Sequence, residues 1–111
     1  MSSEYKVHKG VFLGAEPVIG PWALLGVPPK GYKDGELPLK IGDSTHIRSH
    51  TVIYAGSKIG DSFVTGHGAL VRENVKIGDN VSIGSGTEVE QNCMIGNNVR
   101  IHSNCFIAEG T

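Results

Sequence analysis

Residues 41–58 read IGDSTHIRSHTVIYAGSK, and their opening triplet returns every eighteen residues along the chain. The four copies are Ile41-Gly42-Asp43, Ile59-Gly60-Asp61, Ile77-Gly78-Asp79 and Ile95-Gly96-Asn97. Self-similarity at a fixed period is the signature of a stacked architecture, in which each repeat packs only on its neighbours. The recurrence therefore decides the fold.

A finer period of six residues runs inside each eighteen. A strict period of six does not suit an amphipathic helix, whose apolar stripe repeats about every 3.6 residues. It favours one short strand and one corner per hexad, with three hexads closing a coil, and Gly followed by Asp or Asn suits the corner because these residues adopt left-handed conformations. The position four residues after each aliphatic is mostly small or slender, with Phe63 as the bulky exception. The β-branched residues that occur every six positions are Ile41, Ile47, Ile53, Ile59, Thr65, Val71, Ile77, Ile83, Val89, Ile95, Ile101 and Ile107.

The pattern also exists before Ile41, where Leu13, Ile19 and Leu25 lie six apart and each precedes a glycine. They predict a first coil over 13–30. Residues 28–36 contain two prolines, two glycines and four charged residues, which is typical of a protruding loop.

We expect a single all-β domain over 1–111, with the loop and its return spanning 28–40 and further coils over 41–111. The last hexad ends at Thr111 without a helix or charged cap. Because solenoid ends need covering, we expect the chain to be truncated at its C-terminus.

Composition excludes several classes of protein. Ten basic and eleven acidic residues give a net charge of −1, without the basic excess of a nucleic-acid binder. The N-terminus lacks the apolar segment of a secretory signal, and no apolar run approaches the roughly 20 residues that span a membrane. Cys93 and Cys105 fit free thiols in a reducing compartment. We expect a cytoplasmic protein without membrane insertion.

Residues 13–111 resemble the hexapeptide-repeat acyltransferases, which fold as a left-handed parallel β-helix. The left hand comes from this resemblance, since most parallel crossovers are right-handed. Residues 31–43 and 47–56 look like the N-terminal part of the UDP-N-acetylglucosamine O-acyltransferase of lipid A synthesis. Residues 65–73 and 101–107 are similar to the N-acetyltransferases of nucleotide-linked amino sugars.

The resemblance implies a homotrimer, with acyl-CoA in a groove between neighbouring helices and no metal in the reaction. We expect an N-acetyltransferase that moves an acetyl group from acetyl-CoA to the amino group of a nucleotide-linked sugar, in surface-polysaccharide synthesis. The lipid A enzyme has a catalytic histidine fourteen residues after the aliphatic that opens its coil. Counted from Ile59, that position here is Glu73, which favours the amino-sugar class.

Attack of an amine on a thioester needs a base, and histidine is the natural base near neutral pH. His67 lies between Gly66 and Gly68, where a ligand can approach closely, and faces outward if Thr65 faces inward. We expect it to act in catalysis, the alternative being a solvated or trimer-contact histidine. Glu73, one hexad later, has the same outward phase and is expected to orient a base or take the proton, unless it is merely solvated.

Three further residues are expected to bind substrate. Arg72 and Asn74 flank Glu73 and are placed to meet a phosphate or a carbonyl group of CoA. His50 comes from the preceding coil. For Arg72 and Asn74 the alternative is simple solvation of a corner.

Two alternatives to an acyltransferase exist for this fold, and the sequence argues against the first of them. A γ-class carbonic anhydrase uses the same helix and holds zinc with three histidines, but His46, His50, His67 and His102 occupy different phases of their coils, so no metal site is expected. The chain would also suit a non-catalytic scaffold or a truncated remnant of such an enzyme. Catalysis by this short chain alone is therefore undecided.

Overall fold

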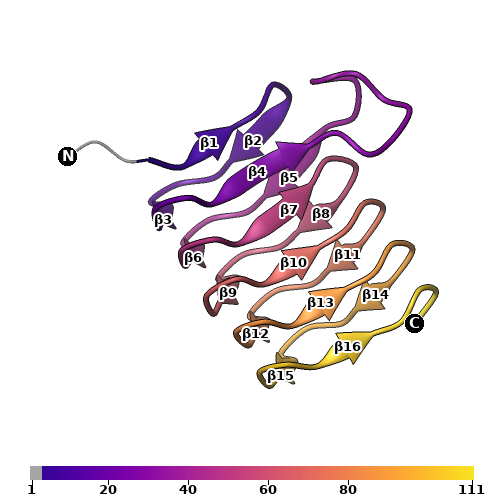
Figure 1. Cartoon of the computed structure of the whole chain (residues 1–111). Helices are drawn as coiled ribbons and strands as arrows, with labels where there is room; N and C mark the ends of the chain where they lie inside the picture. Colours follow the sequence, from indigo (N-terminus) through magenta and orange to yellow (C-terminus); the bar gives the residue numbers. More distant parts are fainter. Residues whose placement is uncertain (1–3) are drawn as a thin grey trace.

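A computed structural model describes residues 4–111. Flat coils stack along one axis, and each coil contributes one short strand to each of three sheets (Figure 1). Sheet A contains β1 (Lys6–Val7), β4 (Leu24–Val27), β7 (Val52–Tyr54), β10 (Leu70–Val71), β13 (Glu88–Val89) and β16 (Phe106–Ile107). Sheet B contains β2 (Val11–Leu13), β5 (Leu39–Ile41), β8 (Lys58–Ile59), β11 (Lys76–Ile77) and β14 (Met94–Ile95). Sheet C contains β3 (Val18–Ile19), β6 (His46–Ile47), β9 (Val64–Thr65), β12 (Ser82–Ile83) and β15 (Arg100–Ile101).

The register of the strands follows the sequence repeat. Ile59 pairs with Ile41 on one side and with Ile77 on the other, and both partners lie eighteen residues away in parallel strands. Neighbouring coils are therefore separated by the ordinary strand spacing of about 4.8 Å. The molecule is a left-handed parallel β-helix with three hexads per coil, as the repeat and the family resemblance together predict, and no helix occurs within residues 4–111.

The core is a thin stack that continues from coil to coil. The recurring aliphatics from Ile41 to Ile95 are buried, and the slender positions between them close the interior. Thr65 replaces an aliphatic and is fully buried, where its hydroxyl pairs with that of Thr51 at 3.1 Å and accepts the Arg48 N–H at 3.2 Å. Phe63 is also fully buried and fills a position that is slender in most other coils.

The loop is an insertion that leaves the stacking intact. Leu13 pairs with Ile41, 28 residues away instead of eighteen, so the loop adds ten residues without shifting the register. Its return is held by the Gly56 N–H, which donates to the Pro38 carbonyl at 2.7 Å. The loop is also fastened through His8, whose Nδ1–H donates to Asp34 Oδ1 at 3.1 Å.

The stack begins earlier than the coil predicted over 13–30. β2 begins at Val11, and β1 precedes it by pairing Lys6 with Leu24 of β4. The sequence pattern does not predict β1, because Val7, the inward residue of this strand, is followed by His8 instead of glycine. Val7 is half-exposed since no further coil covers it in the described structure.

The corners after sheet B need glycine for a reason that differs from the expected one. Gly60 does not adopt a positive φ; Ser62, two residues later, does, at 60°. A Cβ on Gly60 would instead lie 2.8 Å from the carbonyl oxygen of Gly78 and collide with the Asp79 carboxylate. Asp79 Oδ1 occupies this space because it accepts the Asp61 N–H at 2.8 Å.

These aspartates form a column in which each carboxylate accepts a backbone N–H of the preceding coil. Asp61 Oδ1 accepts the Asp43 N–H at 2.8 Å, and Asn97 Oδ1 does the same for Asp79 at 2.7 Å. We expect Asp61→Ala to lower the free energy of unfolding by about 1 kcal/mol, since one hydrogen bond is lost at an exposed corner. Asp61→Asn should keep most of that stability, because Asn97 makes the same contact with an amide oxygen. Urea denaturation followed by circular dichroism measures both, and equal losses would contradict this role.

Candidate functional site

His67 lies at the corner that leads from sheet C to sheet A, called here the C–A edge. Its Nδ1 is 2.8 Å from Ser49 Oγ, and its backbone N–H donates to Ser85 Oγ at 3.0 Å. Both serines occupy the same corner position one coil away. Gly68 follows at φ 68°, and a Cβ there would meet nothing within 4 Å. The imidazole is thus fixed at Nδ1 on an exposed edge that a ligand can approach.

The hydrogen bond to Ser49 bears on what the imidazole can do. When Nδ1–H donates to Ser49 Oγ, Nε2 carries a free lone pair and can accept a proton. His50 is exposed on the same C–A edge, one coil from Gly68. Its backbone has a positive φ of 64°, and its N–H donates to the Pro21 carbonyl. The structure therefore places His50 and His67 on one edge.

Glu73, Arg72 and Asn74 lie at a different corner, which leads from sheet A to sheet B and is called here the A–B edge. Arg72 Nε donates to Glu73 Oε1 at 3.1 Å, and the Arg72 guanidinium lies 4.7 Å from the centre of the Tyr54 ring. Asn74 Nδ2 donates to Asn92 Oδ1 at 2.7 Å. Since strand β10 separates the two edges, the structure does not bring Glu73 to His67 within one chain.

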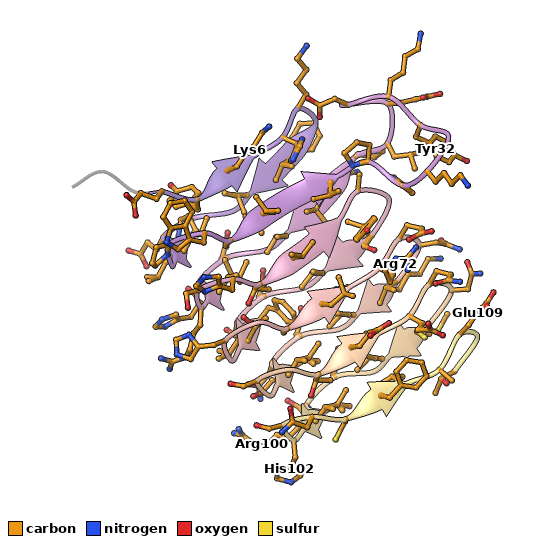
Figure 2. All side chains as sticks on the ribbon, viewed as in Figure 1. Lys6, Tyr32, Arg72, Arg100, His102 and Glu109 are labelled. Atoms are coloured by element: carbon orange, nitrogen blue, oxygen red, sulfur yellow. The ribbon has the colours of Figure 1, made fainter. Side chains whose placement is uncertain are left out.

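The protruding loop folds over the A–B edge and borders an open cavity of about 380 Å³. In Figure 2, Tyr32 and Arg72 lie on the same side of the ribbon, with the loop above the edge. The polar groups of the cavity come from Glu73, Asn74 and Asn92, and its aromatic wall is Tyr32. The complete lining is Pro29, Tyr32, Leu37, Gly56, Glu73, Asn74 and Asn92. Tyr32 and Asn92 were not among the predicted site residues, although the eighteen-residue repeat places Asn92 directly in register with Asn74.

A second hollow, of about 280 Å³, adjoins this cavity on sheet B. Three lysines lie around it, and Lys58 pairs in register with Lys40 on one side and Lys76 on the other. The complete lining is Leu37, Pro38, Lys40, Gly56, Ser57, Lys58 and Lys76. The sequence is sufficient to predict that these lysines lie in one column, because each directly precedes the isoleucine of an Ile-Gly-Asp triplet.

In residues 4–111, no three histidine, cysteine, aspartate or glutamate side chains are grouped so that they could hold a metal ion. The same part of the chain has no helix with the length and apolar character needed to cross a membrane.

Comparison with known proteins identifies the repeat. The family described as bacterial transferase hexapeptide (six repeats) matches residues 56–91 and 74–111, which together make up half of the chain. No curated protein sequence matches the chain. The matched segments contain the stacked hexads of β8 to β16 together with His67, Arg72, Glu73 and Asn74. On this match and on its fold, the chain belongs to the bacterial transferase hexapeptide-repeat family.

Proposed function

We propose that the protein is an acyltransferase that uses acetyl-CoA and acetylates the amino group of a nucleotide-linked sugar. Membership of the hexapeptide transferase family supports acyl transfer in general. The observation that carries the proposal is the geometry of His67, an exposed imidazole fixed by Ser49 through Nδ1 at 2.8 Å. In this proposal Nδ1–H donates to Ser49 Oγ, which leaves Nε2 as the proton acceptor that the reaction needs.

In the proposed reaction, the amine nitrogen of the sugar attacks the thioester carbonyl carbon of acetyl-CoA. A C–N bond forms, the C–S bond breaks, and CoA leaves as a thiolate. His67 Nε2 takes the proton that the nitrogen loses and passes it to the departing sulfur. Ser49 is a positioning residue here, because it contacts the imidazole and not the reacting atoms.

The cavity on the A–B edge supports a sugar as the acceptor. Tyr32 offers an aromatic face for the apolar side of a sugar ring, and Glu73, Asn74 and Asn92 offer hydrogen-bonding groups for hydroxyls. In this proposal Glu73 and Asn74 bind the substrate, and Arg72 holds Glu73 in place through the 3.1 Å contact. His50 borders the acetyl-CoA site beside His67.

A homotrimer would bring the two edges together. Within one chain they border the outer face of sheet A, which carries the partly exposed Leu24, Val52 and Leu70 in one register column. A second copy that covers this apolar column would border both edges. We propose that a sugar on the A–B edge of one copy meets His67 on the C–A edge of its neighbour.

Release of free CoA thiol from acetyl-CoA tests the proposed function. The purified chain is incubated with UDP- and dTDP-linked amino sugars, and the matched control uses the same nucleotide sugars with a hydroxyl in place of the amine. We expect thiol release that depends on the amine. Absence of both turnover and CoA binding would contradict an acyltransferase and favour a non-catalytic scaffold.

A further inference from the structure

The three lysines around the second hollow form a column on the outer face of sheet B. Lys40, Lys58 and Lys76 directly precede the inward isoleucines of β5, β8 and β11, so their side chains emerge at the strand spacing of about 4.8 Å. All three are exposed. The ion pairs within residues 4–111 are His8–Asp34 and Arg72–Glu73, so none of the three lysines has a carboxylate partner there.

Stacked ammonium groups without counter-charges repel one another, and an anion placed between them removes that repulsion. Asp61, on the other edge of sheet B, keeps its charge while its Oδ1 accepts the Asp43 N–H, but it forms no ion pair with these lysines within residues 4–111. From Lys40 to Lys76 the column spans two strand spacings, about 10 Å. This length suits an extended anion with several charges better than a single carboxylate.

The hollow bordered by the three lysines adjoins the cavity lined by Tyr32. Leu37 and Gly56 line both spaces, so the two lie side by side under the same segment of the loop. One space is cationic, and the other combines an aromatic ring with a carboxylate and two amides. A ligand that fills both would carry phosphate charges next to a ring rich in hydroxyl groups.

We infer that Lys40, Lys58 and Lys76 bind the diphosphate of a nucleotide-linked sugar, while the sugar ring lies in the adjoining cavity against Tyr32. The inference rests on the proposed function for the class of substrate. CoA also carries a diphosphate, but the arm attached to it is a flexible chain, which matches the ring-sized polar cavity less well than a sugar does.

Isothermal titration calorimetry of the purified chain tests the assignment of the three lysines to the diphosphate. The ligands are inorganic pyrophosphate, UDP, a UDP-linked amino sugar and CoA. We expect Lys58→Gln to weaken binding of pyrophosphate, UDP and the UDP-sugar roughly tenfold, because a charge-assisted contact is lost. The matched control is Lys6→Gln in β1, an exposed lysine on sheet A that lines neither space; it should leave binding unchanged. Tyr32→Ala should weaken binding of the UDP-sugar and leave pyrophosphate binding unchanged.

Several results would overturn the inference. One is the absence of pyrophosphate binding, and another is an equal loss of affinity in Lys58→Gln and Lys6→Gln. Weakened binding of CoA with unchanged binding of UDP would assign the lysines to the other substrate. Binding of the UDP-sugar that depends on Lys58, without any acetyl transfer, would support this site and reject the proposed function. Acetyl transfer with an unchanged KM for the nucleotide sugar in Lys58→Gln would support the proposed function and reject this site.

Discussion

Gly60→Ala is expected to lower the free energy of unfolding by about 3 kcal/mol, although it adds one methyl group at the surface of the coil. The added Cβ would lie 2.8 Å from the Gly78 carbonyl oxygen and 2.9 Å from its carbon. These are backbone atoms held by the next coil and cannot move independently. The Asp79 carboxylate would also be displaced from the Asp61 N–H, so overpacking and a lost charge-assisted hydrogen bond act together.

Gly96→Ala provides the matched control for this substitution. Gly96 occupies the same position of the repeat, but a Cβ there meets nothing within 4 Å in the described structure. Its substitution should therefore leave stability nearly unchanged. Urea denaturation of both variants, followed by circular dichroism, separates the two outcomes. Equal stability of Gly60→Ala and the parent chain would show that the corner does not depend on the close approach of successive coils.

His67→Gln is expected to reduce kcat for acetyl transfer about 100-fold, the lower end of the range for loss of a general base. Glutamine keeps a side chain of similar length and polarity but cannot take up a proton. KM for both substrates should change little. Ser49→Ala should reduce kcat less, because it removes the contact that orients the imidazole at Nδ1 and leaves the imidazole itself.

The matched control for His67 is His102→Gln, which changes an exposed histidine in the corner segment after β15 on the same C–A edge. It has no side-chain hydrogen bond in the described structure and should leave kcat unchanged. Circular dichroism confirms that each variant remains folded. If His67→Gln keeps full activity, another group removes the proton, and the hydrogen bond to Ser49 serves the structure of the edge only.

The six-residue period was sufficient to predict the coils, because each short strand has one inward residue and burial fixes its phase. The prolines and glycines of residues 28–36 predicted the loop. The period did not predict β1, where Val7 is not followed by glycine, nor did it predict the reason for glycine at position 60. That reason depends on the Asp79 carboxylate of the next coil, a contact between segments that local sequence does not describe.

The candidate site was predictable only in part, for a geometric reason. His67 and Glu73 are six residues apart and share an outward phase, but a step of six in a three-sided coil moves a residue to the next edge. Residues come together when their separation is eighteen, as Asn74 and Asn92 do at 2.7 Å. The cavity also needs the loop to fold back over the A–B edge, and no period in the sequence encodes that return.

A solenoid of near-identical coils has an inherent ambiguity, because a slip by one whole coil preserves most backbone pairing. The fully buried Phe63 and the hydroxyl pair of Thr51 and Thr65 remove it. After such a slip, the phenyl ring would face coils shaped for other neighbours, and a buried hydroxyl would lose its partner. These irregular residues fit only the neighbouring coils that they contact in the native stack. The departures from the repeat therefore fix which coil stacks on which.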